Sequence, residues 1–217
     1  MKEINEILKN IRTDYNLDVL DEISVAKDPI MQFALWMKMA VESGCDDPNA
    51  MNLATVSATG RPSSRIVLLR NFDDGGFVFF TNYHSQKGRD VEANPHAALN
   101  FFWPTLHKQI RIEGIIEKIS ESDSDEYFNT RPKESQLGSI ASNQSNVLKD
   151  RVELEKKIEN LTKEFSDKPI TRPPHWGGYR VVPDKFEFWQ GRPSRIHDRI
   201  QYELSGNKTW NISRLSP

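Results

Sequence analysis

Cysteine is almost absent from this chain, since Cys45 is the only one among 217 residues. An internal disulfide framework needs at least two thiols, and a structural zinc site would need histidine and carboxylate ligands. The five histidines are scattered without HExxH-like spacing, so we predict no metal site. A single cysteine fits a reducing compartment, and we expect a cytoplasmic protein.

Long apolar runs are also missing, and none approaches the ~18 residues of a membrane span. The first ten residues carry Lys2, Glu3, Glu6 and Lys9 and have no apolar stretch of signal-peptide length. We therefore expect neither export nor a membrane partner.

No excess of one charge is present, because 29 basic residues face 31 acidic ones and the formal net charge is -2. A protein so balanced has no global field that would attract nucleic acid, and none is expected as a partner. Any anionic ligand must be bound locally. Glycine-rich GxGxxG and Walker-type loops are missing too, which argues against a doubly wound nucleotide-binding fold.

Short apolar runs dominate the first half of the chain. They are rich in strand-favouring residues and are separated by turn signals at 59–62 and 73–76. Strands spaced about every ten residues, without long helices between them, favour an antiparallel sheet or small barrel. The predicted strands are 51–56, 65–69, 77–81, 97–103 and 109–116, with four more at 178–182, 185–189, 200–204 and 209–213.

Helices are predicted around these strands. Asp28 can cap the first helix, Pro29 suits its first turn and Gly44 can end it. In the middle, 122–129 and a second short helix precede a third with apolar residues at helical spacing, namely Leu154, Ile158, Leu161 and Phe165. The length suits one core, so we expect a single domain over 1–217, with an N-terminal helical segment (1–45) and a helical insertion (121–166).

Arg65 and Arg70 bracket four apolar residues. An interval of five places them on opposite faces of a strand, so they cannot serve one point without a bend. Two solvated strand ends explain the pair equally well if the segment stands alone. The functional alternative is anion binding, in which a guanidinium makes two parallel hydrogen bonds to phosphate oxygens.

Two further segments suit phosphate groups. Segment 80–87 follows a strand and precedes a helix, which would place backbone N–H groups and Lys87 at a helix N-terminus. Tyr127, Arg131 and Ser135 recur every four residues, and Pro132 predicts a corner between helices at Arg131. A capped helix start and an exposed corner with incidental polar groups are the simpler alternatives.

Near the C-terminus, Arg195, His197 and Arg199 alternate in sequence. On a strand they would project from one face. Potential cations so close repel one another unless they share an anionic ligand, which favours a functional role.

Taken together, these segments resemble the pyridoxine/pyridoxamine 5'-phosphate oxidase family. The resemblance covers nearly the whole chain and includes several ordered motifs. Besides the segments above, it is carried by Asp47-Pro-Asn-Ala-Met51, Asn129-Thr-Arg-Pro132, Trp176-Gly-Gly-Tyr179 and the terminal Arg214-Leu-Ser-Pro217.

The resemblance implies a mainly β fold with flanking helices, the FMN-binding split β-barrel, and a homodimer with FMN at the subunit interface. It implies that FMN is held by Arg65, Ile66, Val67, Leu68, Leu69, Arg70, Phe80, Thr81, Gln86, Lys87, Gln109, Gln144, Ser145, Trp189 and Arg199. It implies that Arg195 and His197 are the catalytic residues and face the pyridine ring of the substrate. The implied substrate-binding residues are Arg12, Thr13, Asp14 and Tyr15, from a covering segment, with Arg70, Tyr127, Arg131, Ser135, Arg195, Ile196 and His197.

The implied activity is the FMN-dependent oxidation of pyridoxamine 5'-phosphate and pyridoxine 5'-phosphate to pyridoxal 5'-phosphate, a step of vitamin B6 metabolism. Dioxygen would be the electron acceptor and become hydrogen peroxide, with ammonia released from the amine. Two positions depart from the family pattern: Arg70 stands where lysine is usual, and Gln86 where arginine is usual. Another split-barrel flavin or deazaflavin reductase, or a non-catalytic protein that binds FMN or pyridoxal phosphate, remains an alternative.

Overall fold

The computed structural model describes residues 4, 6, 8, 15 and 17–217, which form two compact units. The first unit contains Met1–Pro48, Phe102–Arg111 and Lys185–Pro217. The second contains Asn49–Phe101 and Ile112–Asp184. Each unit therefore combines segments that are distant in the sequence.

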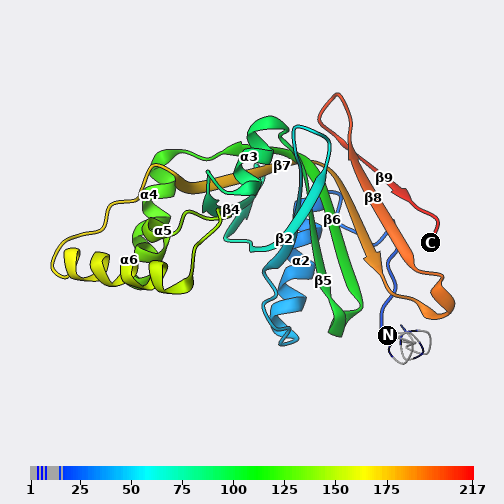
Figure 1. Cartoon of the computed structure of the whole chain (residues 1–217). Helices are drawn as coiled ribbons and strands as arrows, with labels where there is room; N and C mark the ends of the chain where they lie inside the picture. Colours follow the sequence, from blue (N-terminus) through cyan, green and yellow to red (C-terminus); the bar gives the residue numbers. More distant parts are fainter. Residues whose placement is uncertain (1–3, 5, 7, 9–14, 16) are drawn as a thin grey trace. The chain divides into compact units, whose positions relative to one another are not determined.

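The strands make one predominantly antiparallel sheet, as the spacing of apolar runs predicts (Figure 1). Its main path follows the order β2-β1-β5-β6-β7-β4-β3, while β8 pairs with β7 and β9. The strands are β1 (Ala50–Val56), β2 (Pro62–Leu68), β3 (Asn71–Asp73), β4 (Gly76–Asn82), β5 (His96–Trp103), β6 (Lys108–Lys118), β7 (Trp176–Gln190), β8 (Asp198–Leu204) and β9 (Trp210–Arg214).

The helices flank these strands and agree with the predicted ones. Asp28 caps α2 by accepting a hydrogen bond from the N–H of Ile30 at 2.9 Å, and Pro29 is its first residue. The helices are α2 (Pro29–Glu42), α3 (Gln86–Ala93), α4 (Glu121–Thr130), α5 (Lys133–Ala141) and α6 (Arg151–Glu164), with short 3₁₀ turns η1 (Pro104–Leu106) and η2 (Pro193–Arg195). Among the described residues, none of these helices has the length and apolar character needed to cross a membrane.

The core of the second unit is formed by buried side chains of its strands. Alternate residues of β1 are buried, Met51 and Leu53 among them, and Phe77, Phe79 and Leu99 are fully buried as well. On β2 the same alternation leaves side chains exposed, with Ile66 at 65% and Leu68 at 37%. This strand stands at one end of the strand order, so its apolar residues lie along a sheet edge.

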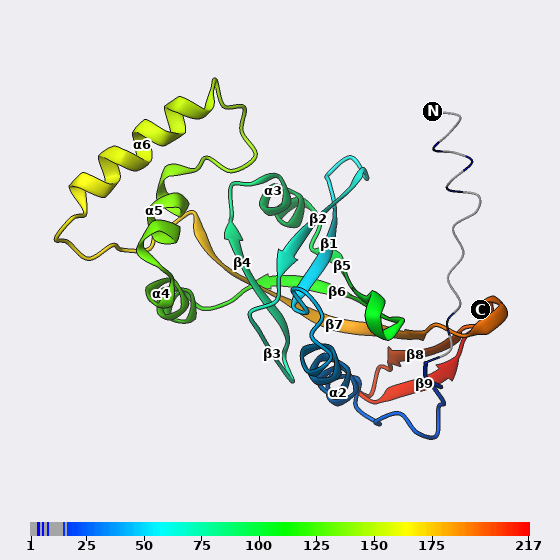
Figure 2. The same cartoon turned by 90° about the horizontal axis from the view of Figure 1, so that it is seen from below.

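A smaller apolar cluster joins α4, α5 and α6, which lie side by side in both views (Figures 1 and 2). Phe128, Leu137, Ile170 and Trp176 are buried there. The predicted stripe on α6 is confirmed, because its four apolar residues are half-buried whereas most other residues of that helix are exposed.

In the first unit, α2 packs against β7 through the rings of Trp36 and Phe188, whose centroids are 5.3 Å apart. The hydroxyl of Tyr202 on β8 donates to the carbonyl of Ala26 at 2.7 Å. Strands β8 and β9 form a hairpin that leads to the C-terminus (Figure 2). These contacts fix the residues before α2 against the C-terminal hairpin.

One strand prediction is wrong. We expected separate strands at 178–182 and 185–189, and the structure has the single strand β7 instead. Strand β7 pairs with β6, β4 and β8. Pro183 falls between the residues of β7 that pair with β4, which end at Val181, and those that pair with β8, which begin at Lys185. The missing N–H of the proline therefore removes no hydrogen bond to β4 or β8, and the strand continues through it.

Candidate functional site

Arg65 lies in a polar cluster between β1, β2 and α3. Its guanidinium donates to Thr55 Oγ1 at 2.7 Å and to Ser63 Oγ at 2.6 Å. Both hydroxyls also donate to the buried carboxylate of Asp90, which lies 3.9 Å from Arg65. Burial lowers the pKa of Arg65, although an arginine so placed remains charged. Asp90 thus fixes the direction of Arg65 through two bridging hydroxyls.

Lys87 lies beside this cluster, on the first turn of α3, and is only 8% exposed. Its ammonium donates to Gln144 Oε1 at 2.8 Å and to Thr81 Oγ1 at 3.1 Å. A longer contact of 3.4 Å reaches Ser85, so the hydrogen-bond partners of Lys87 among the described residues are all uncharged. Burial and the charge of Arg65 lower the pKa of Lys87 to about 8. Arg65 has the carboxylate of Asp90 nearby, whereas Lys87 hydrogen-bonds to uncharged groups, an arrangement that suits an anionic ligand.

The start of α3 is held tightly beneath this cluster. Ser85 caps the helix by accepting a hydrogen bond from the N–H of Gly88 at 3.3 Å. A side chain at Gly88 would meet the carbonyl oxygen of Tyr83 at 1.8 Å, so only glycine allows this approach. The predicted passage from strand to capped helix is confirmed, with the exposed Gln86 as the first helical residue.

Arg70 lies in a separate cavity of about 290 Å³ in the second unit. It follows β2, and its N–H donates to the carbonyl of Val78 at 2.9 Å. Tyr127 lines the same cavity and stacks on Phe80 with ring centroids 3.8 Å apart. Arg65 and Arg70 thus serve different clusters, as their spacing on a strand predicts.

Arg131 occupies the predicted corner between α4 and α5. Its guanidinium lies 4.5 Å from the ring centroid of Trp176 and donates to Ser139 Oγ at 2.6 Å. The pKa of Arg131 is lowered by burial and by the charge of Arg70, and Tyr127 acts in the opposite direction. Arg70, Tyr127 and Arg131 are therefore close enough to interact electrostatically.

The residues predicted to bind the substrate phosphate line two cavities. Arg131 and Ser135 line one of about 270 Å³, together with Gln144, whereas Arg70 and Tyr127 line the one described above. Ser145 is exposed with a left-handed φ of 72° and lines a third cavity with Gln144. Gln144 thus contacts Lys87 and also lines the cavity that contains Arg131.

In the first unit, four rings gather around Gly191. The ring of Tyr15 lies 4.6 Å from His107 and 5.7 Å from both Trp189 and His197, measured between centroids. His197 and Trp189 are themselves 4.7 Å apart. A Cβ atom at Gly191 would meet the ring of Tyr15 at 2.7 Å, so the glycine makes room for that ring.

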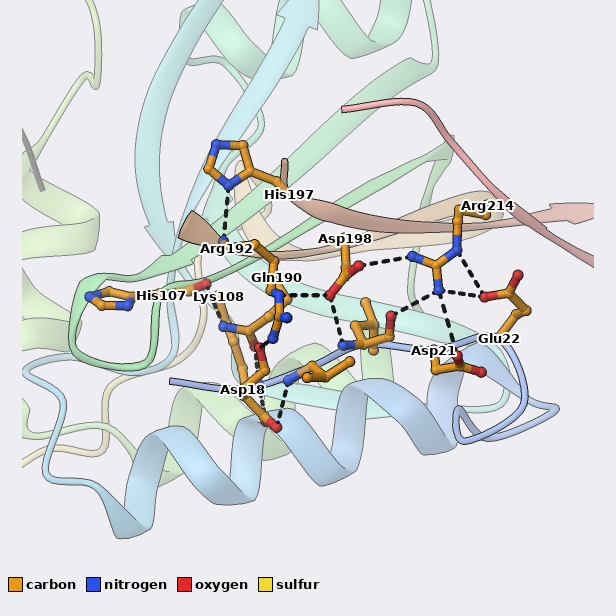
Figure 3. Close-up of polar contacts among 12 residues, drawn as sticks. Asp18, Asp21, Glu22, His107, Lys108, Gln190, Arg192, His197, Asp198 and Arg214 are labelled. Carbon is orange, nitrogen blue, oxygen red and sulfur yellow. Dashed lines mark hydrogen bonds and ion pairs between the residues drawn. The ribbon is translucent and has the colours of Figure 1, made fainter. Parts of the chain in front are cut away.

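His197 has a defined hydrogen-bond direction. Its Nδ1 atom accepts from the backbone N–H of Arg192 at 3.1 Å, which requires an unprotonated Nδ1 (Figure 3). Desolvation by burial and the charge of Arg195 lower the pKa of His197, so the neutral ring is favoured. The proton then lies on Nε2, which can donate to a ligand.

The prediction that Arg195, His197 and Arg199 project from one strand face is wrong. Pro193 introduces the turn η2, Arg195 has a left-handed φ of 61°, and β8 begins only at Asp198. Arg199 does lie on β8, where the buried carboxylate of Glu187 accepts its Nε at 2.8 Å and its Nη2 at 3.0 Å. We expected a shared anionic ligand to balance the charge of Arg199, and the structure has the carboxylate of Glu187 in that role.

The other candidate residues are placed as follows. Ile66 and Leu68 of β2 are exposed, Val67 is half-buried and Leu69, which follows the strand, is buried. Gln109 on β6 is half-buried, and Ile196, after η2, is exposed. Arg12, Thr13 and Asp14 lie outside the described residues.

Sequence reasoning missed Asp90, Arg192 and His107. Asp90 follows Lys87 by three residues on α3, a spacing that places both on one helix face and could have revealed it. The contact made by the N–H of Arg192 could not be predicted from the sequence, because it is a backbone group. His107 has a left-handed φ of 51°, and its Nδ1 atom is buried without a hydrogen-bond partner in the part of the chain that the structure describes.

Comparison with solved structures identifies the class of protein. The chain resembles a pyridoxamine 5'-phosphate oxidase-related, FMN binding protein from Nostoc punctiforme PCC 73102, with a TM-score of 0.70 at 19% identity over 89% of this chain and 99% of that one. It also resembles PhzG from Burkholderia lata 383 in complex with tetrahydrophenazine-1-carboxylic acid, with a TM-score of 0.87 at 32% identity over 93% of this chain and 100% of that one. The mainly β split-barrel fold with flanking helices is thereby confirmed.

Within that class, the family follows from sequence. Residues 37–164 match the pyridoxamine 5'-phosphate oxidase family model, and residues 176–217 match the pyridoxine 5'-phosphate oxidase C-terminal dimerisation region. Pyridoxine/pyridoxamine 5'-phosphate oxidase from Bordetella pertussis is 53% identical over 97% of this chain and 99% of its own. The one from Microcystis aeruginosa is 52% identical over 97% and 98%. The chain belongs to the pyridoxine/pyridoxamine 5'-phosphate oxidase family.

Proposed function

We propose that this protein oxidises pyridoxamine 5'-phosphate and pyridoxine 5'-phosphate to pyridoxal 5'-phosphate, using FMN and dioxygen. Family membership supports an oxidase of this type. The observation that carries the proposal is that cations gather in two clusters of the second unit. One is formed by Arg65 and the buried Lys87, and the other by Arg70 and Arg131, which line cavities that contain Tyr127 and Ser135. A flavin phosphate and a substrate phosphate need two such clusters.

The Arg65 and Lys87 cluster fits the phosphate of FMN. Lys87 is almost fully buried, and its hydrogen-bond partners in the described part of the chain are uncharged, so a phosphate would supply a negative charge. Arg65 is held in place by Thr55 and Ser63 and presents its cation without reorganisation. Gln144 and Thr81 add polar atoms beside the ammonium.

The Arg70 and Arg131 cluster fits the phosphate of the substrate. The charge of Arg70 lowers the pKa of Arg131, which shows that the two cations repel each other in the free protein. A phosphate between them would relieve this repulsion, and the hydroxyls of Tyr127 and Ser135 can donate to further oxygens. Arg70 presents a planar guanidinium group at a position where the family usually has a lysine.

Arg195, Ile196 and His197 are proposed to face the pyridine ring of the substrate. Bound FMN would supply the redox chemistry, in which a hydride leaves the aminomethyl or hydroxymethyl carbon and dioxygen becomes hydrogen peroxide. His197 would donate a hydrogen bond through Nε2, and Arg195 would place the ring by its charge. The imine formed from the amine substrate would be hydrolysed to the aldehyde and ammonia, whereas the alcohol would give the aldehyde directly.

We also propose a homodimer with FMN at the subunit interface. The match of residues 176–217 to the family's dimerisation region supports it. So do the exposed Ile66 and Leu68 on β2, because apolar side chains along a sheet edge are typical of a surface that a partner covers. Under this proposal, residues 1–217 act as one FMN-binding split-barrel domain.

A second candidate is oxidation of a reduced phenazine carboxylic acid. It is favoured by the similarity to PhzG, whose structure holds tetrahydrophenazine-1-carboxylic acid. The Arg70 and Arg131 cluster could meet a carboxylate, although two arginines with two hydroxyls suit the larger charge of a phosphate better.

Oxygen uptake by the FMN-loaded protein separates these candidates. We expect fast uptake with pyridoxamine 5'-phosphate, together with the absorbance of an aldehyde product, and little uptake with tetrahydrophenazine-1-carboxylic acid. The opposite preference would favour the second candidate. A yellow protein that consumes no oxygen with any of these substrates would instead indicate a binding protein.

A further inference from the structure

Residues 17–22 lie between Tyr15 and α2 in the sequence and form neither a helix nor a strand. Most of this segment is exposed, and Leu20 is its only buried residue. Such a segment has little apolar burial to hold it in place. Two groups of ion pairs fix it instead (Figure 3).

The first group surrounds Lys108 on β6. Its side chain is 3% exposed, and its ammonium donates to Asp18 Oδ2 at 2.9 Å and to the amide oxygen of Gln190. The same ammonium lies 4.4 Å from the ring centroid of Trp36. Although burial acts in the opposite direction, hydrogen bonds from Lys108 and from the N–H of Val19 lower the pKa of Asp18. Asp18 is therefore the counter-ion of a buried lysine.

The second group surrounds Arg214 at the end of β9. Its guanidinium donates to Glu22 Oε2 at 3.0 Å and to Asp198 Oδ1 at 2.9 Å, and its Nη2 also reaches the carbonyl of Leu20 at 3.1 Å. Asp21 lies 3.8 Å away. The other oxygen of Asp198 accepts the N–H of Leu20 at 3.1 Å. Arg214 and Asp198 thus hold the backbone of Leu20 from both its donor and its acceptor side.

Both groups meet the residues around His197. Asp198 follows His197 directly, and its carboxylate lies 3.5 Å from Arg192 Nε. The same Arg192 donates its backbone N–H to His197 and its Nη1 to the carbonyl of Asp18 at 2.8 Å. One network therefore fixes the imidazole of His197 and the segment that leads to Tyr15.

We propose that Arg214 and Asp198 are positioning residues, which hold residues 17–22 and thereby keep the ring of Tyr15 against His107, Trp189 and His197. This inference rests on the proposed function for the identity of the ligand. Tyr15 touches His107, Trp189 and His197, and its close approach to Gly191 shows how little freedom the ring has there. Without the ion pairs, residues 17–22 would no longer hold the ring of Tyr15 beside His197.

Arg214→Gln tests the proposal in the FMN-loaded protein, with Arg214→Lys as the conservative variant. Arg151→Gln is the matched control, because it removes an ion pair between Arg151 and Glu155 on the exposed face of α6. We expect amide hydrogen exchange at Leu20 to accelerate at least about tenfold in Arg214→Gln and less than about twofold in the control. The KM for pyridoxamine 5'-phosphate should rise about five- to tenfold with kcat within twofold, while Arg214→Lys stays within threefold of the parent.

A double variant shows whether Arg214 acts through Tyr15. Tyr15→Ala should raise KM by itself, and adding Arg214→Gln should raise it no further. Effects that multiply would overturn the proposal, and so would exchange at Leu20 as slow in Arg214→Gln as in the parent. A parent protein inactive with pyridoxamine 5'-phosphate would refute the proposed function instead, and the exchange rates of Leu20 would then decide the role of Arg214 alone.

Discussion

The Nδ1 atom of His197 accepts a hydrogen bond from the backbone N–H of Arg192 at 3.1 Å. A backbone N–H can only donate, so this contact leaves Nδ1 without a proton and places the proton of the neutral ring on Nε2. The lowered pKa of His197 favours the same form. The neutral imidazole therefore offers a hydrogen-bond donor at Nε2, while its Nδ1 atom is already occupied by the backbone.

Two amide variants of His197 test this orientation. The amide of glutamine can reach the position of Nε2 and donate there, whereas the amide of asparagine reaches only that of Nδ1. We expect His197→Gln to keep kcat/KM within about tenfold of the parent. His197→Asn should lose about 10- to 100-fold, because a hydrogen bond to a charged ligand is worth ~1.5–3 kcal/mol. Equal losses in the two variants, at unchanged FMN content, would remove Nε2 from this role.

Lys87 is expected to distinguish FMN from riboflavin. Lys87→Met removes the ammonium and keeps an apolar stem of similar length, so FMN affinity should fall about 10- to 100-fold, or ~1.5–3 kcal/mol. Riboflavin has no phosphate, and its affinity should change less than about threefold. Flavin fluorescence quenching measures both constants, with the exposed Lys156→Met as the control. A parallel loss for the two flavins would place the phosphate elsewhere.

The lowered pKa of Lys87 also predicts a pH dependence of FMN binding. Its pKa in the flavin-free protein is about 8, against an ordinary value of 10.5, so the ammonium loses its proton as pH rises through about 8. The flavin phosphate stays doubly charged there, since its second pKa is about 6. FMN affinity should therefore fall above pH 8, by up to about tenfold per pH unit.

The Lys87→Arg variant is the control for this titration, because a guanidinium keeps its charge throughout the range. Its FMN affinity should stay level from pH 7 to 9, and a fall as steep as in the parent would contradict the assignment to Lys87. The effect of pH on the stability of the flavin-free protein has the opposite sign to its effect on FMN affinity. Between about pH 8 and 10.5 the unfolded chain binds this proton and the folded one does not, so Lys87 makes the flavin-free protein more stable as pH rises.

Local patterns predicted the elements of the fold well. The cap at Asp28, the helix start at Ser85 and the corner at Arg131 follow from backbone rules that act over a few residues, and all three are present. The strands were predictable because their apolar residues alternate or cluster. Pro183 was misleading because whether a proline interrupts a strand depends on pairing partners far away in the sequence.

Side-chain environments were harder to predict, since they depend on contacts between distant residues. The alternation of Arg195, His197 and Arg199 indicated one face, yet Pro193 and two left-handed residues turn the chain before β8 begins. Glu187 was visible in the sequence, but only pairing of β7 with β8 brings it to Arg199. The ion pair of Lys108 with Asp18 joins residues separated by ninety positions, which no local pattern records.

Arg70 offers the sharpest test of the proposed substrate site, because the family resemblance implies a lysine at this position. Its guanidinium lines the cavity that also contains Tyr127 and lowers the pKa of Arg131 by its charge. A phosphate bound by both arginines would meet two cations. The positive charge of residue 70 is then the property that matters most for binding the phosphate. We therefore expect Arg70→Lys to keep kcat/KM within about tenfold of the parent, or ~1.4 kcal/mol.

Arg70→Met keeps a stem of similar length but removes the cation. The phosphate does not react, so its contact with Arg70 exists equally in the ground state and the transition state. The variant should chiefly raise KM for pyridoxamine 5'-phosphate, by about 10-fold or more, with kcat nearly unchanged. Steady-state kinetics at constant FMN occupancy measure both constants. If Arg70→Met keeps the parent's KM, the substrate phosphate is held without residue 70, and Arg131 with Ser135 becomes its binding site.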